Sequence, residues 1–402
     1  MRVLMSSSPH ALAAALAPFA LTATVEAEYG DRVAPGTLAT LAHHGPRASE
    51  PCPCSEAAYH GLRPHRRINL GGSRSGPVGG VLARPCEAHA PHAETQCPDC
   101  WQWCDVEAIG LSHLDLDALG GVAALLDRRP TAPLFWALAA AVDVRGPHRL
   151  AEEVDRLALF EADRLEGNAI HDSEASGGAC VPWPRESYLA DGRRAAEEAA
   201  RQIRAWWAWS RDNRVMAPRD GGVADATALV EQALRALAVL LGDPSEERAA
   251  MLAAGAALAT NEEVLEARSW VRAEGGVAVR ISDRFVNALY AHEGTAVNCR
   301  APGGCACRGE DGPCDMEYLP WRRVYRAVAA LNTATGQINL SLADPVPGVS
   351  CRAIVQALWG PEAGGHDGIA GSPRGRAMTR DDLDRAARAL AEALMALEAS
   401  RG

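Results

Sequence analysis

The segment that decides the fold reads Gly364-Gly365-His366-Asp367-Gly368-Ile369-Ala370-Gly371. Its glycines let the backbone approach a ligand closely and present N–H groups to an anion. His366 adds a side-chain donor, and Arg374 and Arg376 add cationic donors just beyond the segment. An ordinary glycine-rich turn before a helix has the same composition. The segment therefore predicts either an anion-binding loop or a plain turn.

The sequence around this segment predicts a small α/β unit. The predicted elements are strands over Gly276–Ile281, Val324–Leu331 and Gln337–Leu342, a helix around Ile354–Leu358 and a final helix from Thr379. Residues Asn332–Gly336 join the second and third strands as a hairpin turn. Asp381 and Asp382 suit the first turn of the final helix, because they face the positive end of its dipole.

In this context the glycine segment resembles the GGGH-x-x-A-A-G signature of the C-terminal domain that accompanies DHH phosphoesterases. The resemblance covers roughly residues 275–400, with Ala363 in place of the first glycine. Asn332 and Ser341 occupy strand ends where that domain often carries polar residues. The resemblance implies that the substrate is bound by Gly364, Gly365, His366, Gly368, Gly371 and Arg374.

A second motif, His113-Leu114-Asp115-Leu116-Asp117, follows the short apolar strand Ile109–Ser112. Strand alternation places His113, Asp115 and Asp117 on one side, as a half-shell for a divalent ion such as Mn²⁺. Acidic residues that end a strand and cap a helix are the simpler interpretation. The motif resembles H-x-D-x-D-G, the first metal motif of the same superfamily, with Ala118 in place of the glycine.

The Asp-His-His motif that names the superfamily is absent. The nearest substitutes are Asp143 and His148, after an apolar run, Leu134–Val142, that suits a strand or a helix equally well. His43-His44-Gly45 is a second substitute, but it precedes the first metal motif and would require a permuted site. Solvent-exposed loop histidines are the simpler interpretation there. The chain is therefore either an active enzyme or a degenerate relative that binds without hydrolysing.

Twelve cysteines fall in clusters whose close spacing suits metal ions better than disulfides. We expect structural Zn²⁺ at two groups of four: Cys299, Cys305, Cys307 and Cys314, and Cys86, Cys97, Cys100 and Cys104. Cys52 and Cys54 are further candidates for the second group. Free thiols are the alternative for the first group, and an iron–sulfur cluster for the second. This cysteine use favours a reducing, cytoplasmic setting.

Composition limits the partners. The net charge of −11 disfavours tight binding to long duplex DNA, although a local site can still hold a small anion. No apolar run reaches the roughly 18–20 residues of a membrane span. The apolar stretch Ala11–Ala23 resembles a signal peptide, but Pro18 interrupts it. Trp206, Trp207 and Trp209 are candidates for base stacking or for ordinary core packing.

We therefore expect an α/β fold in two lobes. Residues 1–190 form a DHH-like metal-binding lobe with a mostly parallel sheet and a Cys-rich insertion, 191–274 a helical connector, and 275–402 the smaller DHH-associated substrate-binding domain.

The resemblance also implies a function: metal-dependent hydrolysis of a phosphodiester or phosphomonoester of a nucleotide or short single-stranded oligonucleotide. Mn²⁺ (or Mg²⁺) would be held by His113, Asp115, Asp117, Asp143 and His148. Asp115, Asp117 and His366 would be catalytic. The alternative is a non-catalytic nucleotide- or nucleic-acid-binding protein on a degenerate DHH scaffold. The oligomeric state stays open.

Overall fold

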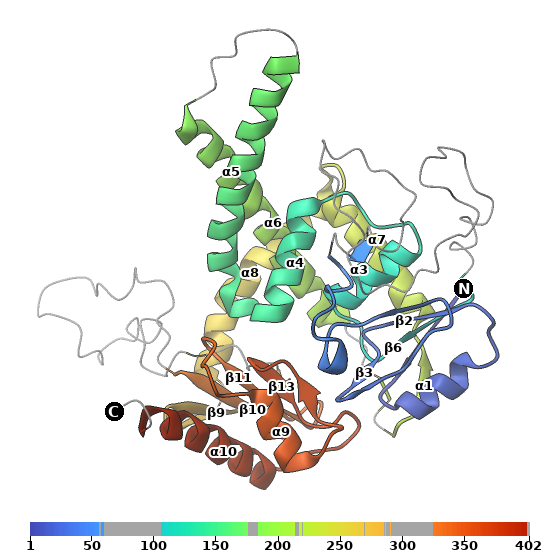
Figure 1. Ribbon diagram of the computed structural model, residues 1–402, viewed down its shortest axis with the longest axis vertical. Coiled ribbons are helices and arrows are strands. Elements are labelled where there is room, and N and C mark those ends of the chain that lie inside the picture. Colours follow the sequence, from blue (N-terminus) through green and yellow to red (C-terminus); the bar gives the residue numbers. More distant parts are fainter. Residues whose placement is uncertain are drawn as a thin grey trace, which may run out of the picture.

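The computed structural model describes residues 1–55, 58–59, 106–175, 184–213, 217–218, 220–268, 270–284, 286, 290 and 325–399. The fold is mixed α/β, as predicted, and both of its larger sheets contain parallel strands (Figure 1). Each of these sheets has its own hydrophobic core.

The first sheet has the strand order β5-β2-β6-β1-β7. Its strands are β1 (Arg2–Ser6), β2 (Thr22–Val25), β5 (Ala39–Leu41), β6 (Ala108–Leu111) and β7 (Val223–Asp225). The first four are mutually parallel, and β7 is an antiparallel edge. Parallel strands are buried on both faces, which explains why β2 and β6 are buried throughout. Between β2 and β5, a two-stranded ribbon pairs β3 (Glu28–Tyr29) with β4 (Arg32–Val33).

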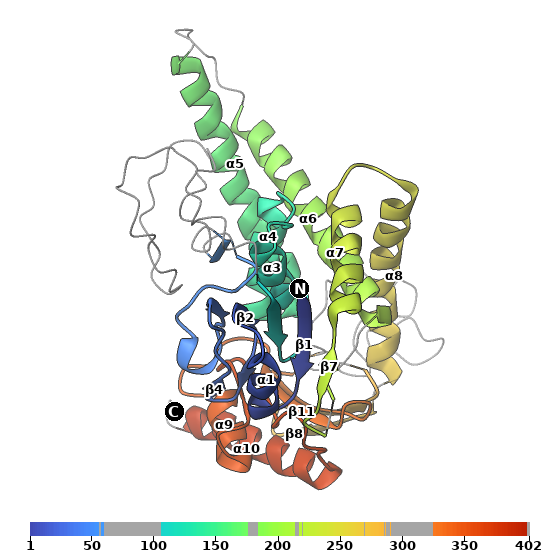
Figure 2. The same cartoon turned by 90° about the vertical axis from the view of Figure 1, so that its right-hand side faces the viewer.

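Helices cover both faces of this sheet. Helix α1 (Pro9–Leu16) packs on one face. The other face carries α3 (Leu116–Leu125), α4 (Pro133–Arg145), α6 (Arg185–Asn213) and α7 (Thr227–Leu241). Helix α5 (Leu150–Ala175) packs along α6 and extends away from the sheets, and α8 (Glu246–Arg268) leads to the second sheet (Figures 1 and 2). Trp206 is buried in this core and stacks on Trp209, so these aromatics pack as core residues.

The second sheet has the order β12-β13-β11-β10-β9-β8. Its strands are β8 (Trp270–Glu274), β9 (Val277–Ser282), β10 (Ala327–Asn332), β11 (Gln337–Leu342), β12 (Gly364–Gly365) and β13 (Ile369–Gly371). Helices α9 (Cys351–Trp359) and α10 (Arg380–Ala399) pack on one face. Thr379 and Asp382 form a reciprocal cap at the start of α10, where the sequence predicted a helix start.

Several elements differ from the sequence predictions. Residues Arg2–Ser6 form an interior strand, in a stretch for which no strand was predicted. The apolar run Leu134–Val142, for which strand and helix were both open, is helical. The expected helical connector, 191–274, ends in a strand, because α8 ends at Arg268 and β8 follows. The hairpin of β10 and β11 is confirmed.

The expected boundary at residue 190 falls inside α6. Helices α6 and α7, expected in a connector, bury apolar residues in the core of the first sheet. Among the described residues, none of the helices combines the length and apolarity that crossing a bilayer requires.

Polar contacts join the two sheets. Arg352 and Gln356 of α9 both bond Asp31, which follows β3. Close backbone packing adds to these contacts, because a Cβ at Gly364 would lie 2.8 Å from Gly30 Cα. This close approach, more than exposure of amides, is why glycine is required at Gly364.

Candidate metal centre

The carboxyl ends of β2, β5 and β6 meet at one edge of the first sheet, because these strands are parallel neighbours. Each strand is followed directly by side chains that can bind a metal: Glu26 and Glu28 after β2, His43 and His44 after β5, and the His113–Asp117 motif after β6. Ligands in open α/β sheets bind at this edge. The sheet therefore gathers three separate pieces of sequence into one place.

His43 lies at the centre of the group and is only 2% exposed. Its Nε2 atom lies 3.2 Å from an oxygen of Asp117 and 3.2 Å from an oxygen of Asp143. His44 Nε2 lies 3.0 Å from Glu26 Oε2. The interpretation of His43 and His44 as solvent-exposed loop residues was therefore wrong, because backbone bonds from both residues to Glu28 Oε1 turn the loop inward.

Glu26 adopts an uncommon backbone conformation. Its φ is 49°, in the left-handed region that residues other than glycine seldom occupy. Its N–H donates to Leu41 O and its carbonyl accepts from the Ser112 hydroxyl, which fix this conformation between the ends of β5 and β6. Such outliers concentrate at functional sites. The conformation buries the Glu26 carboxylate beside His43 and His44.

Asp117 and Asp143 reach the group from two helices. Asp117 lies in the first turn of α3, and its Oδ1 accepts from the backbone N–H of Cys54 at 2.9 Å. Asp143 lies near the end of α4. A metal-ligand aspartate was expected at a strand end, but the helix places Asp143 beside His43 equally well.

His366 joins the group from the second sheet. Its ring centroid lies 4.3 Å from that of His44 and 5.3 Å from that of His43. Its backbone N–H donates to Ile369 O at 2.7 Å, which closes a tight turn between β12 and β13. Gly365 has φ 138°, and a Cβ there would lie 2.5 Å from Ile369 O, so only glycine fits this turn without strain.

Two overlapping sets of side chains could each hold a metal ion, with ligand atoms within 4.8 Å of one another. The first set is His43, His44, Asp143 and His366, and the second is His43, Cys52, Asp117 and Asp143. Because the sets share His43 and Asp143, the geometry accommodates one ion or two adjacent ions.

Unsatisfied polar atoms support this assignment. Within the described part of the chain, seven buried side-chain atoms of this group have no hydrogen-bond partner. They are Glu26 Oε1, Glu28 Oε2, His43 Nε2, His44 Nδ1, Asp117 Oδ2, Asp143 Oδ2 and His366 Nε2. Buried polar atoms are normally hydrogen-bonded, and a bound cation would satisfy carboxylate oxygens and imidazole nitrogens alike. The residues present therefore fit a divalent ion.

The pKa values reflect crowding of like charges away from water. Burial raises the pKa of Glu26 well above its usual value, and Glu28 and Asp117 raise it further. Burial also raises the pKa of Asp143. Burial opposes the charge on His43, but the carboxylates of Asp117 and Asp143, each 3.2 Å from its Nε2, outweigh burial and raise that pKa.

The pKa values of the two neighbouring histidines are lowered instead. Burial, followed by the charge on His43, lowers the pKa of His44, and the same causes lower that of His366 to about 4. Both rings are therefore neutral at pH 7, which is the form that binds metals.

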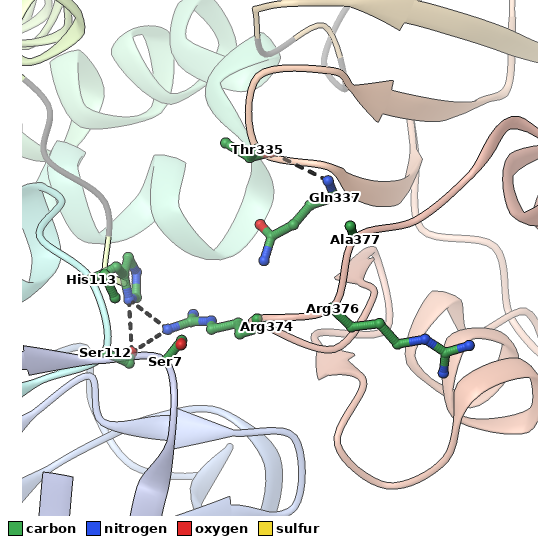
Figure 3. Close-up of a pocket in the computed structure, with 10 residues that line it drawn as sticks. Ser7, Ser112, His113, Thr335, Gln337, Arg374, Arg376 and Ala377 are labelled. Carbon is green, nitrogen blue, oxygen red and sulfur yellow. Dashed lines mark hydrogen bonds between the residues drawn. The ribbon is translucent and has the colours of Figure 1, made fainter. Parts of the chain in front are cut away.

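The His113 motif is arranged differently (Figure 3). His113 Nε2 lies 2.8 Å from Asp115 Oδ2, and Asp115 Oδ1 accepts from Ala118 N–H as the cap of α3. Arg374 crosses from the second sheet to bond Ser112 and His113 Nδ1, the latter at 3.0 Å. Since arginine only donates, His113 Nδ1 accepts and its Nε2–H faces Asp115. Of the three residues predicted to form a half-shell, Asp117 alone belongs to a ligand set, the second one.

The structure places the other predicted site residues apart from these sets. His148 Nε2 contacts Ala343 O at 2.9 Å and its ring packs on Tyr290, because α4 ends before it and a 3₁₀ turn directs it away. Gly371 pairs with β11, and Gly368 O accepts from Leu342 N–H, so both shape the hairpin. All eight cysteines of the two predicted zinc groups lie outside the described residues.

Two cavities flank the centre. A cleft of about 920 Å³ runs from the glycine loop past His148, between the end of α4 and the loop after β11. A smaller cavity of about 140 Å³ is lined by Ser7, His113, Gln337 and Arg374 among others (Figure 3).

The sequence analysis left Glu26, Glu28 and Cys52 out of the site. The sequence signal that could have found them is the presence of acidic residues and a His-His pair at the ends of short strands. Which strands pair in parallel, however, cannot be predicted from the local sequence. Comparison of this chain with protein-family models, with curated proteins and with solved structures found no match.

Proposed function

We propose that this protein is a metal-dependent phosphoesterase that acts on a nucleotide or a short oligonucleotide. The proposal rests chiefly on the position of His366. The glycine hairpin of the second sheet brings this histidine within ligand distance of His43, His44 and Asp143 of the first. A cation site and a loop suited to anions therefore share one edge, as phosphoryl chemistry requires.

The resemblance to DHH phosphoesterases gives this arrangement a consistent interpretation. The His43-His44 pair takes the role of the missing histidine motif, and the order of motifs along the chain is permuted. The permuted order is compatible with a single site, because β5, β2 and β6 are parallel neighbours whose carboxyl ends lie together whatever their order in the sequence. The two-lobed division predicted from sequence would place this centre between the lobes.

The side chains have distinct roles in this proposal. A divalent ion, Mn²⁺ by family resemblance, supplies an acidified water and polarises a phosphoryl oxygen when bound. His43, Asp117 and Asp143 hold and orient the site, and His44, with its lowered pKa, stays a neutral donor or ligand at pH 7. His366 positions the phosphate, and Arg374 fixes the His113 loop beside it.

The adjoining cleft suits the rest of the substrate. Its volume of about 920 Å³ lies within the roughly 300–1,000 Å³ of typical ligand sites. Tyr290, Val346 and Pro347 supply apolar walls, while Arg149 and Ser350 supply polar atoms. A nucleoside beside the scissile phosphate would find both kinds of contact there.

Hydrolysis of bis-p-nitrophenyl phosphate by the full chain, with and without added Mn²⁺, tests this function. We expect release of nitrophenol that chelation abolishes and Mn²⁺ restores. His366→Ala should lower kcat/KM by about ten- to a hundredfold, because it removes one charge-assisted contact to phosphate.

Phosphoesterase function is contradicted if the metal-loaded protein hydrolyses neither this diester nor short oligonucleotides. Nucleotide binding that persists without turnover would instead indicate the non-catalytic alternative.

A further inference from the structure

Cys52 lies where the hydrophobic core of the first sheet meets the metal centre. It is buried, and its Sγ atom lies 3.4 Å from His43 Nδ1 and 3.8 Å from Ala140 O. With His43, Asp117 and Asp143 it forms the second of the two potential ligand sets. Three buried atoms of that set, His43 Nε2, Asp117 Oδ2 and Asp143 Oδ2, lack hydrogen-bond partners.

The chain is built to bring this cysteine in. Gly120 and Gly121 lie on the face of α3 against which residues 52–54 pack. A Cβ at Gly120 would lie 2.4 Å from Cys54 Cβ, and one at Gly121 would lie 2.8 Å from Pro53 Cβ. Two adjacent glycines are costly inside a helix, at about 1 kcal/mol each relative to alanine, so close packing accounts for their presence.

Hydrogen bonds fix the same segment. Cys54 N–H donates to Asp117 Oδ1 at 2.9 Å, and the Arg129 guanidinium donates to Cys54 O at 2.9 Å. The segment is thereby tied to the helix turn that carries Asp117. As a result, Cys52 is held on the same side of the site as Asp117.

We infer that Cys52 is a thiolate ligand, and that the metal position it shares with His43, Asp117 and Asp143 takes a zinc-class ion. Thiolate is a soft ligand that selects Zn²⁺, Co²⁺ or Fe²⁺, whereas Mn²⁺ and Mg²⁺ prefer oxygen. A set of one sulfur, one imidazole nitrogen and two carboxylates also matches the four-coordinate preference of zinc. This inference rests on the metal centre of the proposed function and changes the ion expected there.

Cobalt titration of the full chain tests the inference, because Co²⁺ bound to thiolate gives a near-ultraviolet charge-transfer band. We expect Cys52→Ser to remove part of that band, relative to wild type. Cys54→Ser is the matched control, since it makes the same change two residues away in a buried side chain outside the ligand sets. An equal band in wild type and Cys52→Ser overturns the inference, as does an equal loss in both variants.

A second variant covers misfolding of Cys52→Ser. Cys52→Asp replaces the soft ligand by an oxygen ligand, so we expect the ratio of Zn²⁺ to Mn²⁺ affinity to fall by about tenfold or more. An unchanged ratio in a protein with wild-type circular dichroism overturns the inference.

Failure of the inference and of the proposed function give different results. If Cys52→Ser changes neither the cobalt spectrum nor Mn²⁺-dependent hydrolysis, only the thiolate assignment fails. If the cobalt band depends on Cys52 but no phosphodiester is hydrolysed, the metal assignment stands and the phosphoesterase function fails.

Discussion

The loop after β5 and the loop after β6 end neighbouring parts of the same sheet edge, yet they use histidine and acid in opposite ways. In the β6 loop, His113 bonds Asp115 and, from the second sheet, Arg374, while Asp115 caps the start of α3. In the β5 loop, His43 and His44 lie against the carboxylates of Glu26 and Asp117, each of which has one oxygen without a hydrogen bond. The motif with the better sequence signature is therefore largely self-satisfied, and the plainer His-His pair forms the centre of the site.

The difference shows that a metal site is recognised by buried polar atoms that lack hydrogen-bond partners. An imidazole between an arginine and an aspartate already has its partners, so an ion there must displace them. An imidazole among buried carboxylates gains from a cation, because burying like charges together is costly. Asp117 is the residue that the two loops share: it belongs to the β6 motif but faces His43.

The largest expected effect is that of Asp117→Asn. We expect the affinity for the ion and the rate of hydrolysis to fall by about a hundredfold or more. Losing a residue that only supports a metal ligand costs about 10- to 100-fold, and losing a direct ligand such as Asp117 should cost at least as much. Without metal, the free energy of unfolding of this variant should lie within about 1 kcal/mol of the wild-type value or exceed it, because the substitution removes one buried charge.

Asp115→Asn is the matched control for that variant, since asparagine still caps α3. It should retain most of the ion affinity. Isothermal titration with Mn²⁺ and Zn²⁺ measures both variants, and equal losses would show that the two aspartates act as one half-shell.

Gly365→Ala should follow in size. Its φ of 138° and the 2.5 Å approach to Ile369 O predict a loss of about 1–3 kcal/mol in the free energy of unfolding. Displacement of His366 should weaken phosphate binding as well. Gly368→Ala is the control, because no atom lies within 4 Å of a Cβ placed there. Urea unfolding of both variants would reject the packing argument if their midpoints coincide.

The pH dependence of the metal-free protein comes next. From about pH 7.5, a unit above the ordinary histidine pKa of 6.5, His44 and His366 are largely neutral in both the folded and the unfolded state and contribute little to the slope. His43, Glu26 and Asp143 have raised pKa values, so the folded state binds more protons than the unfolded chain. Stability should therefore fall as pH rises above about 7.5.

With a bound ion, stability should instead rise with pH. The ion competes with those protons for the same ligands, so its affinity increases as pH rises. Chemical denaturation at several pH values, with chelator and with saturating Zn²⁺, measures both slopes. Parallel slopes in the two series would mean that the ion binds elsewhere.

The smallest effect should come from His113→Gln. Its contacts to Asp115 and Arg374 are charge-assisted hydrogen bonds of about 1.5–3 kcal/mol each, but glutamine can replace part of them and neither holds the ion, so kcat/KM should fall by no more than about tenfold. His43→Gln should lower kcat/KM far more in the same assay. Similar losses in both variants would erase the contrast between the two loops.

The sequence by itself determined the elements whose signals are local. The hairpin Ala327–Leu342 was predicted from a polar turn between apolar runs, and the start of α10 from Thr379 and Asp382. Period-two and cap signals act within a few residues, so the chain carries them wherever it folds.

Only the tertiary structure decided the site. Parallel pairing of β5, β2 and β6 brought Glu26, His43 and Asp117 together from distant positions, and nothing local specifies which strands become neighbours. Helix α4 delivered Asp143, and packing on Gly120 and Gly121 delivered Cys52. Contacts of this kind depend on the closing of long loops, which sequence periodicity does not encode.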